Sequence, residues 1–259
     1  MTMKKIEQVF NTESIPSNDE YIDKVNDTKA FNLILENQFE CFDVLRKKVK
    51  SIKIASIQIL DKLKSNPKSR IFYVGAGTSA RIGVQDGAEL FPTFGWPINR
   101  VKFIIAGGKK SLIKSSEGAE DNVDYAKYLV KLNKLKSSDI VICISASGKT
   151  PFTFEVLKLA SKIGCLTVSI ENNIDGKFSK ISDCPIILNT GKEIVAGSTR
   201  LKAGTSQKIC LNLISTFIMT RLGYVKNGLM INMIPGNNKL KKRKEKILKI
   251  LNKNKVNKK

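Results

Sequence analysis

Two glutamates, Glu89 and Glu120, each lie just downstream of a glycine-rich segment in a chain of 259 residues that contains no histidine. Without histidine, a general acid or base that works near neutral pH has to be a carboxylate, a lysine, a tyrosine or a cysteine. Two carboxylates in different surroundings can supply one acid and one base. We therefore take Glu89 and Glu120 as the first candidates for acid–base chemistry.

A hydroxyl-rich loop, residues 145–151 with the sequence SASGKTP, follows a predicted strand and opens a predicted helix. Hydroxyls and free backbone amides at a helix N-terminus bind anions, and the helix dipole favours a phosphate there. Ordinary capping by one serine or threonine is the alternative. The loop carries more polar groups than one cap requires, so we predict a phosphate site. Its residues are Ser145, Ser147, Gly148, Lys149 and Thr150.

The segment 75–79, with the sequence GAGTS, occupies the same strand-to-helix position one unit earlier. A tight turn alone is one interpretation of its two glycines; the other is a substrate-binding segment, in which Gly77, Thr78 and Ser79 contact the substrate. A dinucleotide fingerprint would need a third glycine soon after Gly77 and an acidic residue at the end of the next strand. Gly83 lies too far along, and no such acid follows. NAD binding is therefore not expected, and no cofactor is predicted.

A third polar segment, residues 196–205, joins hydroxyls, two cations and two glycines before an apolar helix. A simple capped helix start explains part of this pattern. The other interpretation is a second polar wall for an anionic sugar. The residues of that wall are Glu193, Ser198, Thr199 and Lys202.

The elements that position these residues alternate between short β-rich runs and helix-length segments. This order is typical of right-handed βαβ crossovers, and near-continuous apolar strands indicate a parallel sheet covered on both faces. We predict strands at 71–74, 101–105, 140–144, 166–170 and 185–188, and helices at 80–90, 121–132 and 152–163.

The regions before and after this alternating pattern are predicted to be helical. Apolar residues recur at helical spacing between Glu20 and Leu63, which predicts two helices, and Asn66-Pro67 ends the second. A long helix at 202–222 and a basic helix at 239–251 complete the chain. We predict an N-terminal extended segment with helices (1–66), a sugar-phosphate-binding α/β domain (67–225) and a C-terminal segment with a basic helix and tail (226–259).

The net charge of +22 comes largely from lysine, since only seven of the 45 basic residues are arginine. The last 21 residues hold eleven of these cations, so nearly half of the excess is a terminal tail. A specific nucleic-acid site would favour arginine and clustered aromatics, so none is expected. The five cysteines have no paired metal spacing and indicate a reducing cytoplasm without a bound metal. No segment has the apolar length of a membrane helix.

Taken together, the motifs resemble the N-acetylmuramic acid 6-phosphate etherases of the sugar isomerase (SIS) superfamily. The similarity extends from about residue 12 to about residue 240, with Ala80 where the family usually has glycine and Lys149 where it usually has arginine. The segments that carry it are VGAGTS (74–79), DGAELFPTFG (86–95), IAGG (105–108), EGAED (117–121), SASGKTP (145–151) and GSTRLKAGTSQK (197–208).

The resemblance implies an SIS-type doubly wound parallel sheet and a lyase of amino-sugar catabolism and peptidoglycan recycling. Its reaction would cleave the D-lactyl ether of N-acetylmuramic acid 6-phosphate to N-acetylglucosamine 6-phosphate and D-lactate, with no cofactor or metal. By motif position, Glu89 matches the proton donor and Glu120 the second catalytic residue. Glu117, one helical turn before Glu120, is the reserve candidate. The resemblance also implies a cytoplasmic homodimer with sites near the subunit interface.

Helix geometry constrains Glu89. It lies ten residues beyond Ser79, which is roughly 15 Å along a helix that rises ~1.5 Å per residue. Either that helix ends early, or Glu89 serves a site whose phosphate loop comes from the partner subunit. Two other functions stay open: a sugar-phosphate-binding SIS regulator without catalysis, and an SIS-type aldose–ketose isomerase.

Overall fold

A five-stranded parallel sheet forms the centre of the protein, described here from a computed structural model. The structure describes residues 11–17, 21–114 and 116–256, with the backbone alone for 252–256. The strand order is β2-β1-β3-β4-β5, so the chain reverses its direction of winding between β1 and β3. The strands are β1 (Ile71–Gly75), β2 (Val101–Ile105), β3 (Ile140–Ser145), β4 (Leu166–Glu171) and β5 (Cys184–Ile187).

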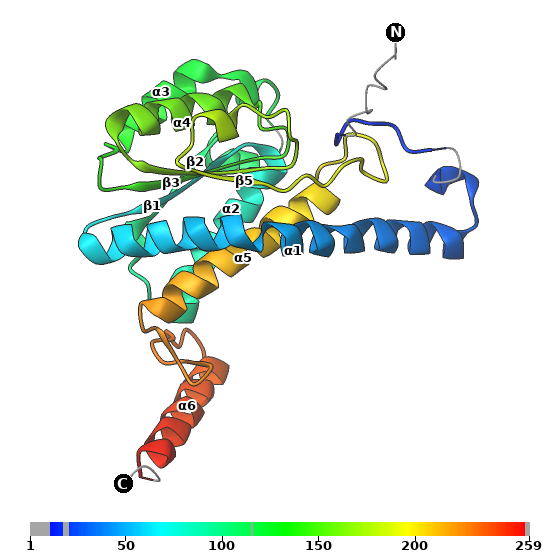
Figure 1. Cartoon of the computed structure of the whole chain (residues 1–259). Coiled ribbons are helices and arrows are strands. Elements are labelled where there is room, and N and C mark those ends of the chain that lie inside the picture. Colours follow the sequence, from blue (N-terminus) through cyan, green and yellow to red (C-terminus); the bar gives the residue numbers. More distant parts are fainter. Residues whose placement is uncertain (1–10, 18–20, 115, 257–259) are drawn as a thin grey trace.

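Side chains of β1, β2 and β3 alternate between two hydrophobic cores, one on each face of the sheet, and β4 and β5 contribute to the first core. In β1, Ile71 and Tyr73 join one core, and Phe72 and Val74 join the other. Helices cover both cores and give three layers (Figure 1). The first core lies under α1 (Asp27–Ser65), α2 (Gly77–Phe94) and α5 (Lys202–Arg221), and the second under α3 (Val123–Leu132) and α4 (Pro151–Ile163).

The region predicted as two N-terminal helices is one long helix, α1, which corrects that expectation. The Asn26 side chain caps it by accepting the main-chain N–H of Lys29 at 2.9 Å. No glycine or proline lies between Asn26 and Pro67, so no helix-breaking residue divides this stretch. Figure 1 shows α1 crossing α5 beneath the sheet, and these two helices pack together extensively.

Helix α2 is longer than its predicted bounds of 80–90, because it begins at Gly77 and ends at Phe94. Its C-terminal turn closes when the main-chain N–H of Gly95 bonds to Phe91 O at 2.8 Å. Pro92 lies in this last turn, where only one helical hydrogen bond is lost. The helix is therefore continuous from the loop after β1 to a point beyond Glu89.

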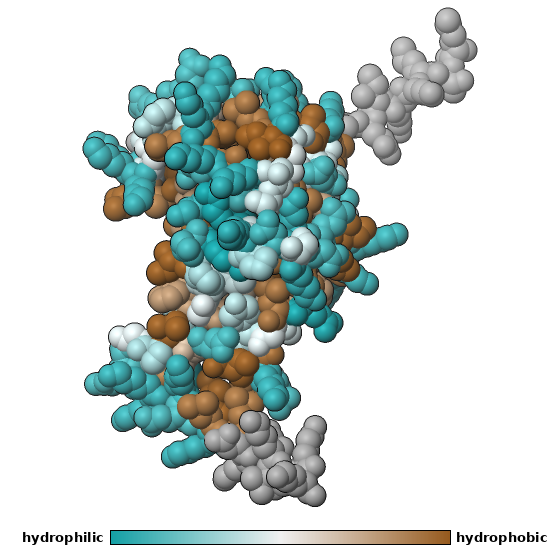
Figure 2. Space-filling model, turned by 90° about the vertical axis from the view of Figure 1, so that its left-hand side faces the viewer, coloured by the Kyte–Doolittle hydropathy of each residue, from teal (hydrophilic) through white to brown (hydrophobic). Residues whose placement is uncertain are grey.

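The last part of the described chain leads away from the sheet. A short antiparallel hairpin, β6 (Val225–Lys226) and β7 (Leu229–Met230), turns at Asn227-Gly228 and precedes α6 (Asn238–Val256). The predicted basic helix is present, and Figure 1 shows it projecting from the three layers. Figure 2 shows hydrophilic side chains over most of one face and a group of apolar ones near the C-terminal end. No helix in the described ranges combines the length and apolarity of a membrane span.

Candidate functional site

The polar segments predicted from the sequence meet where the winding direction reverses. Strands β1 and β3 are neighbours, and helices α2 and α4 start from their carboxyl ends. Ligands of open α/β sheets bind in the crevice beside such a reversal. Residues 75–79 and 145–151 lie at the carboxyl ends of these two neighbouring strands, on either side of the crevice that the reversal predicts.

The loop after β3 is organised around the hydroxyl of Ser145. This hydroxyl lies 2.9 Å from the Thr150 hydroxyl and 3.3 Å from the Ser147 hydroxyl, and it accepts the Gly148 N–H at 3.1 Å. Pro151 is the first residue of α4, and the Thr150 side chain does not cap that helix. The loop thus places three hydroxyls at an N-terminus with free amides, which suits an anion.

The loop after β4 supports this arrangement from behind. The Asn172 N–H bonds to Ala146 O at 2.9 Å, and the Lys177 N–H bonds to Gly148 O at 2.8 Å. Lys149, predicted as a phosphate ligand, forms an exposed ion pair with Asp175 of the same region. The Lys149 ammonium is therefore held at the rim of the loop.

In the first turn of α2, Gly77 is exposed, Thr78 is half-buried and Ser79 is buried. The Ser79 hydroxyl donates to Gln207 Oε1 at 2.9 Å, and Gln207 Nε2 donates to Asn172 Oδ1 at 2.8 Å. This chain of hydrogen bonds ties α2 to α5 and to the end of β4. Ser79 therefore braces the crevice in this structure, and its contact with substrate stays a prediction.

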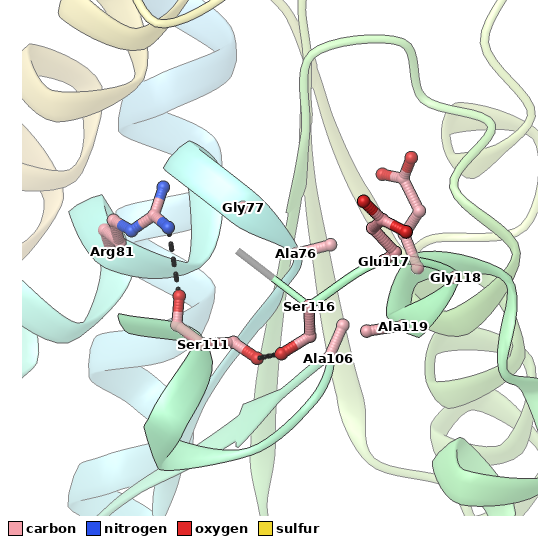
Figure 3. Close-up of a pocket in the computed structure, with 10 residues that line it drawn as sticks. Ala76, Gly77, Arg81, Ala106, Ser111, Ser116, Glu117, Gly118 and Ala119 are labelled. Carbon is pink, nitrogen blue, oxygen red and sulfur yellow. Dashed lines mark hydrogen bonds between the residues drawn. The ribbon is translucent and has the colours of Figure 1, made fainter. Parts of the chain in front are cut away.

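A cavity of about 220 Å³ opens beside Gly77, at the carboxyl ends of β1 and β2 (Figure 3). Glu120 lies in the short helix η5 (Ala119–Asp121) at the border of this cavity, and Glu117 lines it from the turn before that helix. Gly118 between them has a φ of +65°, so the two glutamates are not one helical turn apart, which corrects that expectation. Both carboxylates are exposed. The structure thus places the second catalytic candidate and its reserve in one cavity next to the crevice. The other described lining residues are Ala76, Arg81, Ala106, Ser111, Ser116, Gly118 and Ala119.

Arg81 was not among the predicted site residues, although it lines this cavity. It follows the polar loop after β1 by two positions, and it is the cation nearest in sequence to that loop. Figure 3 shows Arg81 on one side of the cavity and Glu117 on the other. An arginine within one helical turn of a predicted anion loop was the signal that could have found it.

Glu89 lies elsewhere. It is exposed on α2, and it does not line the cavity that contains Glu120. The helix runs on to Phe94, so the possibility that α2 ends before Glu89 is excluded. Within one copy of the chain, the structure does not bring the two candidate glutamates together.

The remaining predicted wall residues are organised around the start of α5. The fully buried carboxylate of Glu193 accepts the main-chain N–H groups of Lys202 at 3.0 Å and Ala203 at 2.8 Å. Burial raises the pKa of this carboxyl, while those two N–H groups act in the opposite direction. The buried Lys202 side chain pairs with Glu40 of α1. Both groups therefore have protein partners in this structure.

Ser198 and Thr199 lie half-buried in the loop before α5. The N-terminal segment reaches this loop, because the Gly197 N–H bonds to Thr12 O at 2.9 Å. Thr12 also accepts a hydrogen bond from Asn173 Nδ2 at 3.0 Å, next to the end of β4. The loop is thus tied to the carboxyl edge of the sheet, and its role in binding stays a prediction.

The site offers hydroxyls, main-chain amides, carboxylates and one arginine. Among the described residues, no group of three or more cysteine, aspartate or glutamate side chains could hold a metal ion. This set of groups can bind an anionic, hydroxyl-rich molecule and move protons between oxygen and carbon.

Comparison with known structures supports the fold. A phosphoheptose isomerase from Francisella tularensis superposes with a TM-score of 0.56 at 13% identity, covering 76% of this chain and 100% of the other. The sugar isomerase domain of an RpiR transcription factor from Sphaerobacter thermophilus gives 0.51 at 17% identity, with coverages of 87% and 97%. At these identities the likeness shows an SIS-type fold alone.

Sequence comparison is more specific. Residues 53–161 match the family described as glucokinase regulatory protein N-terminal SIS domain. An N-acetylmuramic acid 6-phosphate etherase from Oceanobacillus iheyensis is 42% identical over 226 residues, which cover 86% of this chain and 76% of that protein. An etherase of the same name from Mycoplasma mycoides is 39% identical over 244 residues, with coverages of 93% and 80%. The chain therefore belongs to the N-acetylmuramic acid 6-phosphate etherase family.

Proposed function

We propose that this protein cleaves the D-lactyl ether of N-acetylmuramic acid 6-phosphate, yielding N-acetylglucosamine 6-phosphate and D-lactate. One observation carries the assignment to this site: the hydroxyl loop and the glutamate cavity flank the same strand. The loop follows β3 and the cavity lies at β1 and β2. Neighbouring strands are ~4.8 Å apart, so β3 and β2 are separated by roughly 10 Å. This separation suits a hexosamine whose phosphate is at one end and whose ether is near the other.

The chemistry is an elimination followed by addition of water, which makes the enzyme a carbon–oxygen lyase. Opening of the sugar ring exposes an aldehyde at C1 and acidifies the proton at C2. A base removes that proton, and an acid protonates the ether oxygen as lactate departs from C3. Water then adds at C3 of the unsaturated intermediate. One carboxylate and one carboxylic acid are sufficient for these proton transfers.

Glu120 supplies one of these two groups, since it borders the cavity beside the crevice. Ser145, Ser147 and Thr150 hold the phosphate through their hydroxyls and the free amides of α4. Glu89 supplies the second group to the site of a partner subunit in a homodimer. The exposed position of Glu89 on α2, outside the cavity of its own chain, supports this arrangement.

Mixed dimers test the shared site. A Glu89→Gln chain is combined with a Ser147→Ala chain, each inactive as a homodimer. If every site takes Glu89 from one chain and the phosphate loop from the other, one site of each mixed dimer is intact. About half of the activity per mixed dimer should then return. Mixed dimers that stay inactive would refute the shared site and leave the reaction itself untouched.

The reaction is tested with N-acetylmuramic acid 6-phosphate in deuterium oxide. Elimination and addition should release D-lactate and leave deuterium at C2 of the N-acetylglucosamine 6-phosphate. Release of lactate without deuterium at C2 would contradict the mechanism. Tight binding of the compound without any release of lactate would instead favour a non-catalytic sugar-phosphate regulator.

A further inference from the structure

Arg81 is held in a fixed orientation by two consecutive carbonyl groups. Its Nε donates to Leu112 O at 2.9 Å, and its Nη2 donates to Ser111 O at 3.0 Å. Both acceptors belong to the short helix η4 (Lys109–Leu112) that follows β2. These two bonds use the Nε–Nη2 edge of the planar guanidinium.

The other edge of the guanidinium is available. Arginine has five N–H donors, and two are used, so the Nη1–Nη2 end keeps two parallel N–H groups. In the described part of the chain, no protein group accepts a hydrogen bond from this end. Two parallel donors on a preoriented plane match the two oxygens of a carboxylate.

The charges around the cavity explain why an anion would need Arg81. Among its described lining residues, Glu117 and Glu120 are the carboxylates and Arg81 is the only cation. A ligand carboxylate that entered near two glutamates without a partner cation would be repelled. Arg81 therefore determines whether this cavity accepts an anionic group.

We propose that Arg81 is the specificity-determining residue that binds the carboxylate of the lactyl group; this inference rests on the proposed function. The substrate has two anionic groups, a phosphate and the lactyl carboxylate. The hydroxyl loop after β3 suits the phosphate, which leaves the carboxylate for the cavity at β1 and β2. That carboxylate is separated from the ether oxygen by one carbon, so Arg81 and Glu120 would act on adjacent parts of the leaving group. Arg81 would hold the lactate while its ether bond breaks.

A purely structural role is the competing explanation, because Arg81 also fixes the backbone at Ser111 and Leu112. The two roles predict different substrate dependence. If Arg81 only fixes the backbone at Ser111 and Leu112, its loss would lower the rate with every substrate to a similar extent. Loss of a carboxylate contact would slow only a substrate that carries the carboxylate.

The test compares N-acetylmuramic acid 6-phosphate with its lactyl carboxamide, which has nearly the same shape and no charge. A charge-assisted contact is worth about 1.5–3 kcal/mol, so the wild type should prefer the acid by roughly 10- to 150-fold in kcat/KM. Arg81→Met should reduce this preference to within about threefold of unity, and Arg81→Lys should keep an intermediate preference because it retains a point charge.

Arg100→Met is the matched control. Arg100 also donates from Nε to a main-chain carbonyl, Ser69 O at 2.9 Å, but it does not line the cavity. Its substitution should leave the preference for the acid unchanged. Calorimetric binding of the acid and the amide gives the same ratio without turnover, and thermal unfolding checks that each variant is folded.

The proposal would be overturned if Arg81→Met lowered kcat/KM for the acid and for the carboxamide by the same factor, because the preference for the acid would then be retained. Equal binding or equal cleavage of the acid and the amide by the wild-type protein would overturn it as well. Failure of the proposed function is a separate result: wild-type protein would release no lactate from the acid, whatever preference the binding measurements give.

Discussion

The carboxyl group of Glu171 lies directly behind Gly148 of the hydroxyl loop, residues 145–151. A Cβ atom at position 148 would stand 2.1 Å from Glu171 Oε2, and one at Gly176 would stand 2.2 Å from the same oxygen. Glu171 is fully buried, its Oε1 accepts the Ser179 N–H at 3.2 Å, and its Oε2 has no hydrogen-bond partner among the described residues. The loop and the carboxyl group can share this space only because both neighbouring positions are glycine.

Gly148→Ala should therefore destabilise the protein and weaken substrate binding. Gly148 has a φ of +63°, which costs a residue with a Cβ roughly 1–2 kcal/mol. Overpacking against Glu171 adds about 1–3 kcal/mol. Urea unfolding should show a loss of about 2–5 kcal/mol in the free energy of unfolding, and KM for the phosphorylated substrate should rise.

Gly191→Ala is the control for that substitution. Gly191 has a φ of +66°, and no atom lies within 4 Å of a Cβ built there. Its free energy of unfolding should fall only by the cost of the positive φ, roughly 1–2 kcal/mol. A Gly148→Ala/Glu171→Ala double variant should recover part of the stability lost by Gly148→Ala. Equal losses at the two glycines would show that contact with Glu171 is unimportant.

Glu171 should also make stability depend on pH. Burial raises the pKa of its carboxyl above the ordinary value of 4.5, and nearby Asp175 acts in the same direction. The folded state then binds more protons than the unfolded state once the pH exceeds that ordinary value. Folding stability consequently falls as the pH rises from there to the folded-state pKa, by at most about 1.4 kcal/mol per pH unit.

Glu171→Gln removes this ionisation and nearly preserves shape. Urea unfolding between pH 4.5 and pH 8 should show that the variant loses less stability than the wild type as the pH rises. Glu193, whose pKa is also raised by burial, is present in both proteins, so only the difference between them belongs to Glu171. Identical pH slopes would mean that Glu171 titrates normally in the folded protein.

The sequence was sufficient to predict the sheet. All five strands were expected within one residue of their observed ends, as in 140–144 against Ile140–Ser145. The reason is physical: strands buried on both faces are short apolar runs, and loops with glycine and hydroxyl residues mark their carboxyl ends. The same logic placed the hydroxyl loop between β3 and α4. The hairpin at Asn227-Gly228 was missed, although Asn-Gly is a strong turn signal.

The partners of individual polar side chains could not be predicted. Ser79 and Gln207 are 128 positions apart, and Glu40 and Lys202 are 162 positions apart. Local spacing reports the face of a helix or the end of a strand, but it contains no information on which distant polar groups become neighbours. The sequence therefore predicted which segments lie at the carboxyl edge of the sheet, but not which of their polar side chains have protein partners there.

Glu193→Ala should lower stability by removing the acceptor at the start of α5. Two buried N–H groups, those of Lys202 and Ala203, would lose their partner. Loss of a helix cap costs about 0.5–2 kcal/mol, and an unsatisfied buried donor costs about 1–3 kcal/mol. Urea unfolding should show a decrease of roughly 2–4 kcal/mol for Glu193→Ala and a smaller one for Glu193→Gln, which keeps one acceptor. An increase in KM without loss of stability would instead support the predicted substrate contact.

Glu120→Gln should abolish most of the catalysis while leaving the fold intact, because the carboxylate is exposed and borders the cavity. Removal of a general acid or base lowers kcat by about 10²–10⁴-fold. Glu117→Gln is the matched control, since Glu117 borders the same cavity and is also exposed. It should lower kcat by less than about tenfold, as expected for a carboxylate that transfers no proton. The rate of D-lactate release at saturating substrate gives kcat for both variants. If Glu117→Gln has the larger effect, the proton-transferring carboxylate of this cavity is Glu117, three residues before the glutamate that the motif indicates.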